Sequence, residues 1–514
     1  MNFSFTKTCR WKLNSRLFKY EKENTQEISL STDKINLTRF KFPSNISILL
    51  LIGCGSLFSI CTGCKKYVQI GDAPNKLPAS AVFADSSDAT SAILGMYSSV
   101  MAYSSFPAFF NGYATVYTGL ASDELYPSNS SNSDDLQFYS NTITPMGNST
   151  DANFWSNAYT YIYQANACIA GLQTSTTLST TVKNQLMGEA LTFRALCYFY
   201  LVNMFGAVPL ITTTDYHVNA SVPRTSVDTV YTQIINDLAS AESLMTPNYP
   251  SKGRVRPNQY TASALLAKAY LYTQQWANAQ TEASKAINSG LYSLNSNLNG
   301  VFLAGSNEAI WQLIPLQQGY ETSDGALLLP NYGQVPYTGD IPTYSINTPL
   351  LNAFEPGDLR RANWVDSNIV NGTNYYFAFK YKLGQDYNSS PSEYYMICRL
   401  AEQYLIRAEA EAQQGQSAAI TDLNTVRTRA GLVGYAGATD QNSVLSAIYH
   451  ERQIELFCEM GNRWFDLKRT GKADSIMSIV TPTKGGSWSS NWQLFPVPLD
   501  QIQLNPFLTQ NTGY

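Results

Sequence analysis

Charge and histidine are both scarce in this sequence. Asp, Glu, Lys and Arg make up only 14% of the 514 residues, and there are 2 histidines, whereas average soluble domains carry about 25% charged residues. The formal net charge of -4 argues against binding to a nucleic-acid backbone, which needs a basic excess. Global disorder is also disfavoured, because 13% of the residues are aromatic. Hydroxyl and amide side chains must therefore solvate the surface.

Closely spaced cysteines are missing from the body of the chain. Its cysteines each lie inside an apolar helical pattern: Cys168, Cys197, Cys398 and Cys458. We expect no disulfide framework and no zinc site from such spacing, and we predict buried, inert thiols. The doublet Asp134–Asp135 could suggest calcium, but we interpret it as solvated loop charge. The sequence predicts neither a metal nor a cofactor.

Familiar catalytic motifs are absent as well. The sequence has no GxSxG elbow, HExxH pair, glycine-rich phosphate loop or Walker lysine. His450–Glu451 lacks a second histidine four residues on, and His217 has no obvious partner. A carboxylate pair for glycoside hydrolysis is not excluded, since it needs only two suitably spaced acids. The acids here lie mostly in helical patterns or exposed turns, so we predict that the protein is not an enzyme.

No apolar run reaches the length of a membrane span. Residues Ile46–Ile60 form the longest candidate, with about 15 apolar or small residues against the roughly 20 that a spanning helix needs. Basic residues precede this run, and small residues and a cysteine follow it, a pattern typical of an export signal. We interpret residues 46–63 as the apolar core of a lipoprotein signal. Residues 1–45 are an N-terminal extension that fits no signal, and the start is predicted to be assigned too far upstream.

Two cysteines preceded by glycine compete as the lipidated residue. LIGC, ending at Cys54, matches a lipobox better. Cleavage before Cys54, however, leaves the signal with a short apolar core and gives the mature chain an apolar N-terminus. Cleavage before Cys64 uses the whole apolar run and begins a soluble chain. We prefer Cys64, with Cys54 as the alternative, and residues 64–80 as the lipidated tether. A further interpretation treats both as ordinary residues of a cleaved signal.

The body shows helical periodicity in several long segments. Apolar residues recur at spacings of three and four over residues 155–172, 183–205 and 226–245. Residues 260–294 have small and aromatic residues at the offsets of a helical hairpin of tetratricopeptide type, a repeat of about 34 residues. Residues 399–431 form a second such unit, with unrelated helical hairpins as the alternative. The pattern predicts a mainly α fold, a scaffold of tetratricopeptide-type hairpins.

Two segments have a different texture. Residues 102–149 are rich in Tyr, Phe, Ser and Asn, and residues 300–391 alternate short apolar runs with turn residues. We interpret both as loop-rich insertions, the second with a few short strands.

Several motifs in order resemble the SusD/RagB family of bacterial outer-membrane lipoproteins, over residues 64–514. They are ERQIELFCEMGNRWFDLKRTG at 451–471, FPVPLDQIQLNPFLTQNTGY at 495–514, Gly188–Glu189–Ala190 leading to Phe205–Gly206 and Val208–Pro209–Leu210, Arg399–Leu400–Ala401–Glu402 with Ala408–Glu409–Ala410, and Cys64–Lys65–Lys66–Tyr67. The resemblance implies a SusD-like fold, with residues 81–299 as its N-terminal helical region and 300–514 as its C-terminal region.

The same resemblance implies a function. Such proteins are anchored by lipid to the outer membrane, face the cell exterior, and lie as a lid on a TonB-dependent β-barrel transporter of SusC type. They capture oligosaccharides, or peptides in some members, and pass them to the barrel. The helical scaffold would contact the barrel, and the loop-rich part would hold the ligand. A secreted glycan hydrolase and a structural adaptor remain as alternatives.

The signature at 451–471 reads physically as structure. Leu456, Met460, Trp464 and their neighbours share one face of a single helix predicted over residues 444–469. At helical spacing, Glu455 and Glu459 can pair with bases near Arg463, and Asp466 with Arg469 or Arg463. A direct role of Arg463 and Asp466 in ligand contact is the alternative.

Neutral sugars call for flat aromatic rings and short polar side chains. The segments 103–126 and 320–344 have that composition. The candidate ligand-binding residues are Tyr103, Phe109, Asn111, Tyr113, Tyr320, Tyr332 and Tyr337. The other interpretation, which the sequence leaves open, is that most of these aromatic residues fill the core or the barrel interface.

Overall fold

The computed structural model describes residues 79–101, 109–146, 150–316, 319–334, 339–385 and 390–514. The chain divides into two units, Met1–Asn75 and Lys76–Tyr514, and all described residues belong to the second. The predicted lipidation sites Cys64 and Cys54 lie outside the described residues, as do the candidates Tyr103 and Tyr337.

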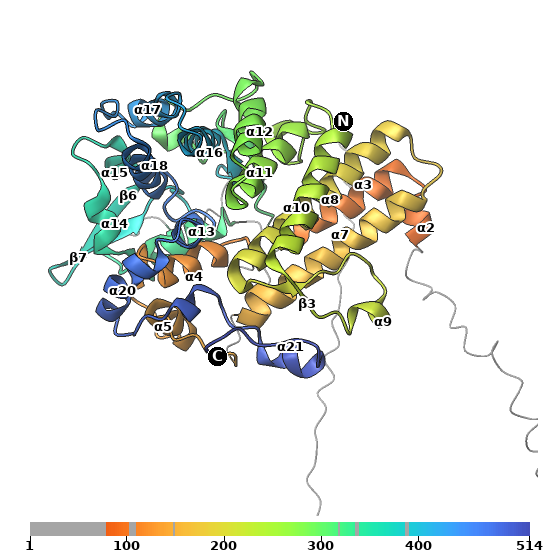
Figure 1. Cartoon of the computed structure of the whole chain (residues 1–514), viewed down its shortest axis with the longest axis horizontal. Coiled ribbons are helices and arrows are strands. Elements are labelled where there is room, and N and C mark those ends of the chain that lie inside the picture. Colours follow the sequence, from red (N-terminus) through yellow and green to blue (C-terminus); the bar gives the residue numbers. More distant parts are fainter. Residues whose placement is uncertain (1–78, 102–108, 147–149, 317–318, 335–338, 386–389) are drawn as a thin grey trace, which may run out of the picture. The chain divides into compact units, whose positions relative to one another are not determined.

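The scaffold is a row of helices, each packed against the next (Figure 1). Its members are α7 (Ser156–Thr174), α8 (Thr180–Phe205), α10 (Val227–Leu244), α11 (Gln259–Tyr272), α12 (Trp276–Asn288), α16 (Leu400–Gln413), α17 (Ala419–Arg429) and α18 (Gln441–Glu455). The helix α12 packs directly on α16, although a long loop-rich segment separates them in sequence. The predicted mainly α fold is confirmed.

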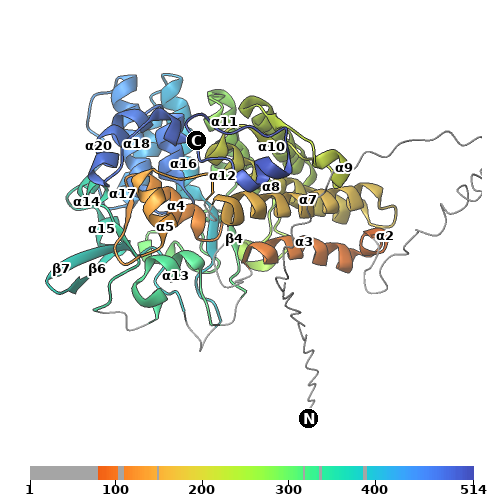
Figure 2. The same cartoon turned by 90° about the horizontal axis from the view of Figure 1, so that it is seen from below.

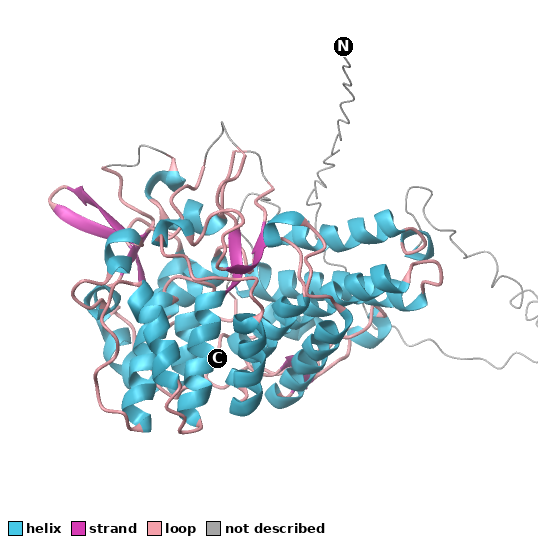
Figure 3. Cartoon of the chain, turned by 90° about the horizontal axis from the view of Figure 1, so that it is seen from above, coloured by secondary structure: helices cyan, strands magenta, loops and turns pink. Residues whose placement is uncertain are grey.

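Shorter elements surround this row. The helices are α2 (Ala79–Val82), α3 (Ser86–Met101), α4 (Tyr113–Ala121), α5 (Ser133–Ser140), η1 (Asp151–Trp155), α9 (Tyr216–Asn219), η2 (Lys252–Arg254), η3 (Leu298–Gly300), α13 (Ser323–Leu328), η4 (Pro330–Gly333), α14 (Thr348–Ala353), α15 (Leu359–Asn363), α19 (Asn462–Arg469), α20 (Ala473–Thr483), η5 (Ser490–Gln493) and α21 (Leu499–Leu504). The strands among the described residues pair antiparallel as β1 (Leu125–Pro127) with β5 (Tyr344–Ile346), β2 (Val208–Pro209) with β3 (Arg224–Thr225), β4 (Ala309–Leu313) with β8 (Tyr395–Arg399), and β6 (Val365–Val370) with β7 (Thr373–Ala378). The hairpin β6–β7 and α13 lie on one side of the row (Figures 2 and 3).

The hairpin α11–α12 is built as its small residues predict. Ala267, Ala279 and Ala286 are completely buried, so the two helices approach closely. The turn between them passes through Gln274 in the left-handed region, with φ of 58°, and Gly290 at φ of 72° follows α12. The helical hairpin predicted over 260–294 is therefore confirmed. The second unit is confirmed by α16 and α17.

The longer predicted helices also agree with the structure. The backbone N–H of Thr229 donates to the side-chain oxygen of Ser226, which caps α10. Gly188 on α8 faces Met245, and a Cβ on this glycine would lie 2.4 Å from the Met245 Cγ. The glycine therefore allows α8 and α10 to pack closely.

The expectation that residues 102–149 form loops is wrong for α4 and α5. Every residue of α4 is buried. A helix buried on all sides has no polar face, so it lacks the periodicity by which amphipathic helices are recognised. The Tyr, Thr and Gly content of Tyr113–Ala121 also disguises it, because these residues are weak helix formers.

The signature at 451–471 forms two helices, not the single predicted one. The helix α18 ends at Glu455, and α19 begins at Asn462. Between them Cys458, Met460 and Gly461 have φ of 49°, 48° and 79°. These left-handed residues cannot continue a right-handed helix. Gly461 alone signals this break in the sequence, since Cys and Met rarely adopt positive φ.

The break allows Glu455, at the end of α18, and Glu459, within the break, to reach distant bases. Glu455 contacts the guanidinium groups of Arg360 at 2.8 Å and Arg399 at 2.5 Å, and it also pairs with Arg429. Glu459 pairs with Arg399 at 2.8 Å. Burial would raise the pKa of Glu455, but the surrounding guanidinium groups hold it well below its usual range.

The predicted local ion pairs are partly wrong. Arg463 pairs with Asp123 at 2.6 Å and not with Glu455 or Glu459, because α19 runs in a new direction after the break. The pair of Asp466 with Arg469, at 2.7 Å, is confirmed. Both Arg463 and Asp466 are thus engaged in buried ion pairs that hold the fold.

We expect Glu455→Gln to destabilise the fold strongly. The substitution leaves three buried guanidinium groups without their shared counter-charge, which typically costs about 3–5 kcal/mol. The measure is the free energy of unfolding from urea denaturation at pH 7. Glu355→Gln is the control, since this side chain pairs with Arg427 but is 36% exposed, and its loss should stay below about 1 kcal/mol. Equal losses in both variants would contradict the central role of Glu455.

Candidate functional site

The first predicted ligand segment is largely closed to solvent. Phe109, Asn111 and Tyr113 are all buried. The Phe109 ring lies 4.2 Å from the ring of Phe110 and meets Tyr200 edge to face, centroid to centroid 5.8 Å. Phe109 therefore belongs to the core in this structure and presents no platform to a ligand. Phe109 therefore fits the other interpretation of these aromatic residues, in which they fill the core.

The second predicted segment contains an exposed ring. Tyr332 is 57% exposed and lies in η4, where both it and Asn331 have left-handed backbone, with φ of 54° and 49°. Such conformations cost of order 1–3 kcal/mol each and persist where the surroundings impose them. Tyr320 is half-buried and forms an isolated bridge with Gln385. We call the exposed ring of Tyr332 and its turn the Tyr332 platform.

Close backbone packing holds the Tyr332 platform in place. A Cβ on Gly333 would lie 2.3 Å from the Gly384 nitrogen, and one on Gly384 would lie 2.3 Å from the Tyr332 carbonyl oxygen. Only glycine permits such an approach. The turn therefore rests on the segment around Gly384 through main-chain atoms.

Two buried carboxylates organise that supporting segment. Glu393 accepts hydrogen bonds from the backbone N–H groups of Lys382 at 2.7 Å and Leu383 at 3.1 Å. Glu321 accepts from the backbone N–H of Glu393 at 2.9 Å and of Ser392 at 3.0 Å. Burial raises the pKa of Glu393 to about 7, against the opposing effect of the amides. The two acids tie the start of α13 to the strand β8.

A third carboxyl lies in the helix that comes just before the platform in the chain. Asp324, in α13, is buried, and its Oδ1 has no hydrogen-bond partner among the described residues. Burial raises the pKa of Asp324 to about 8, although the hydroxyls of Thr115 and Tyr395 act in the opposite direction. The carboxyl is therefore mostly protonated at neutral pH. It can join α13 to α4 without placing an unpaired charge in the core.

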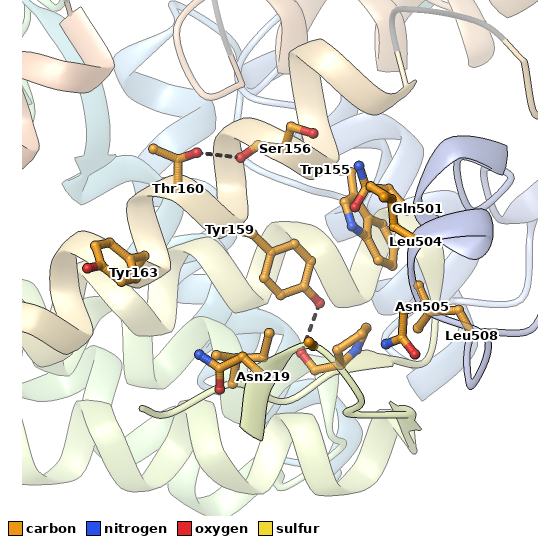
Figure 4. Close-up of a pocket in the computed structure, with 13 residues that line it drawn as sticks. Trp155, Ser156, Tyr159, Thr160, Tyr163, Asn219, Gln501, Leu504, Asn505 and Leu508 are labelled. Atoms are coloured by element: carbon orange, nitrogen blue, oxygen red, sulfur yellow. Dashed lines mark hydrogen bonds between the residues drawn. The ribbon is translucent and has the colours of Figure 1, made fainter. Parts of the chain in front are cut away.

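A groove that the sequence did not predict lies between α7, α9 and α21 (Figure 4). Its volume is about 680 Å³. Tyr159 and Tyr163 of α7 line one wall, and Asn219 and Leu504 lie opposite. One signal for this groove in the sequence is the spacing of four residues between Trp155, Tyr159 and Tyr163.

The remaining chemical groups serve the structure. Asp135, interpreted from sequence as solvated, is buried, and Tyr344 donates to it at 3.0 Å. His450 contacts the Ala353 carbonyl at 2.8 Å, while His217 is exposed and its ring lies tilted against that of Tyr216, with centroids 3.8 Å apart. No cluster of His, Cys, Asp and Glu suited to a metal ion occurs within the described ranges.

The cysteines and helices in the described part of the chain point to no reactive thiol and no membrane-spanning segment. The four body cysteines are free and buried, as predicted, and burial raises the pKa of each thiol. Among the helices that the structure describes, none combines the length and the hydropathy needed to cross a bilayer.

Residues of the family motifs also form ion pairs and hydrogen bonds that stabilise the fold. Glu189 pairs with Arg256 at 2.6 Å and accepts from the Tyr97 hydroxyl at 2.9 Å. At the C-terminus, the Asn511 side chain donates to the carbonyls of Phe205 and Phe495. The helical row, the loop-rich insertion within it and the C-terminus fastened by Asn511 together form a SusD-like fold.

Two family descriptions match this chain. Residues 90–271 match a family described as "Starch-binding associating with outer membrane", and residues 352–514 match the SusD family. The chain belongs to the SusD/RagB family.

Curated and solved relatives agree with this assignment. A SusD-like protein from Formosa agariphila is 26% identical over 88% of this chain and 97% of its own. The starch-binding protein SusD of Bacteroides thetaiotaomicron is 26% identical over 62% of this chain and 71% of its own. A solved laminarin-binding SusD-like protein is 25% identical, with a TM-score of 0.69 over 83% of this chain and 99% of that one. The last two of these relatives are described as binding proteins.

The protonated state of Asp324 has a measurable consequence. A carboxyl whose pKa is raised in the fold stabilises it fully below the unfolded value near 4, and that contribution falls as pH rises through about 8. Asp324→Asn should therefore gain stability relative to the parent protein between pH 5 and pH 8.5, measured by urea denaturation. Asp500→Asn, at an exposed position of α21, is the control for the loss of a surface carboxylate. A parallel pH profile for Asp324→Asn would show that this carboxyl is ionised in the fold.

Proposed function

We propose that this protein is a cell-surface receptor that captures oligosaccharides and delivers them to a SusC-type TonB-dependent transporter. The observation that carries the proposal is the family match together with an exposed aromatic ring held on a rigid turn in the loop-rich part. The relatives named for starch and laminarin binding support neutral glycans over peptides as ligands.

The Tyr332 platform fits the chemistry of a neutral sugar. An aromatic face packs against the C–H groups of a pyranose ring, and neighbouring amides and hydroxyls bind its hydroxyl groups. Asn331 and Gln334 flank the ring and are exposed. Because glycine contacts fix the turn in advance, little conformational entropy is lost on binding. Tyr103 and Tyr337 remain candidates for the same site.

The proposed location is the outer face of the outer membrane. The export signal at 46–63 and a lipid on Cys64 would anchor the mature chain there, and residues 64–80 would tether the folded body. The family description "associating with outer membrane" supports this location. Delivery to a transporter also requires such a position.

Removal of the Tyr332 ring should weaken glycan binding. Affinity electrophoresis in gels containing laminarin or soluble starch shows which of the two glycans retards the parent protein. For that glycan, we expect Tyr332→Ala to lower the affinity at least tenfold, because the substitution removes the stacking face. Tyr332→Phe should keep most of the affinity. Ile369→Ala is the control, since this side chain is 71% exposed on the hairpin β6–β7. Unchanged mobility of Tyr332→Ala in a gel that retards the parent protein would remove Tyr332 from the site.

Lipidation at Cys64 predicts a change of location. We expect Cys64→Ala to abolish incorporation of labelled palmitate and to release the protein from the outer-membrane fraction, whereas Cys54→Ala should remain anchored. The reverse result would favour Cys54, and retention of both variants in the membrane would contradict a lipid anchor at either cysteine. In detergent extracts, the anchored protein should co-purify with a β-barrel transporter.

A further inference from the structure

The groove between α7, α9 and α21 has an aromatic ladder on one wall. Trp155, Tyr159 and Tyr163 follow one another at intervals of four residues, so successive rings are spaced about 6 Å along the helix. Trp155 is buried and supports the half-buried Tyr159 from behind, with ring centroids 5.2 Å apart, whereas Tyr163 is 55% exposed. The Tyr159 hydroxyl donates to the Pro209 carbonyl at 2.8 Å, which fixes its ring in the position drawn in Figure 4.

The facing wall supplies amides. Asn219 donates through Nδ2 to the Thr213 carbonyl at 2.8 Å, but its buried Oδ1 has no hydrogen-bond partner in the described chain. Asn505 donates to the Val222 carbonyl at 2.9 Å, which holds the end of α21 beside the groove. Side-chain amides such as these can donate to and accept from the hydroxyl groups of a ligand.

Charge complementarity narrows the class of ligand. None of the described residues that line the groove carries a charge, so an anionic or cationic ligand would lose its hydration without compensation. Aromatic faces on one side and amides on the other suit a chain with apolar ring faces and many hydroxyl groups.

We propose that this groove binds a short stretch of neutral oligosaccharide, as a second site distinct from the Tyr332 platform. The two sites are built from different elements, α7, α9 and α21 in one case and η4 in the other. The class of ligand assigned to this groove, a neutral oligosaccharide, rests on the proposed function. The position of the site does not depend on it. A second site on the same body would hold a long glycan at two points and so raise its effective concentration at each.

The test uses the folded full chain with two defined probes, maltoheptaose and laminariheptaose. Hydrogen–deuterium exchange should show protection by at least one probe at 155–163 and 499–508, in addition to 320–334. Titration calorimetry with that probe should give two sites. Tyr163→Ala should remove the first set of protected segments and weaken that site roughly tenfold, while Ile369→Ala should change neither.

Each outcome decides between the two proposals. Protection confined to 320–334, with Tyr163→Ala unchanged, would overturn the second site and leave the proposed function standing. Protection confined to the groove would support the second site and remove the Tyr332 platform. The inference would be overturned if neither oligosaccharide protected any segment from exchange. It would also be overturned if a co-purified transporter protected the groove segments and neither oligosaccharide did.

Discussion

Glu455 is buried among guanidinium groups that come from three separate parts of the chain. Arg360 lies in the loop-rich insertion, Arg399 at the start of α16, and Arg429 at the end of α17. A single carboxylate therefore joins the insertion to the helical row. Buried ion pairs often contribute little net stability, because desolvation offsets the attraction. Their geometry is nonetheless demanding, so we infer that this network specifies how the insertion sits on the scaffold.

The position of the insertion on the scaffold also affects the strained turn at Asn331 and Tyr332. Two consecutive left-handed residues at Asn331 and Tyr332 are tolerated only if neighbouring segments impose the conformation. Gly384, which packs against this turn, lies four residues after Lys380, and Lys380 pairs with Glu459 at 2.5 Å. The charge network and the exposed ring are thus linked through a few residues of one segment. Rigid support of this kind lowers the ordering cost when a ligand binds.

The sequence predicted elements whose signals are local. Helical periodicity over 226–245 predicted α10, and small residues at regular offsets predicted the hairpin α11–α12, because amphipathic stripes and close helix packing depend on nearby residues. It failed at α4, which is buried on every side, and at Cys458, whose left-handed backbone no residue preference announces. The partners of Glu455 also escaped prediction, since its bases lie far away in sequence and local spacing suggested Arg463 instead.

Aromatic composition could not separate core from site for the same reason. Phe109, Tyr163 and Tyr332 are equivalent as residue types, yet the first is enclosed by other rings and the other two are exposed. Their difference arises from which elements cover them, a property of the assembled fold. Both exposed tyrosines are uncharged and stand on supports fixed by backbone or side-chain contacts. Binding at either would depend on shape and desolvation of the ring face, and salt would screen little of it.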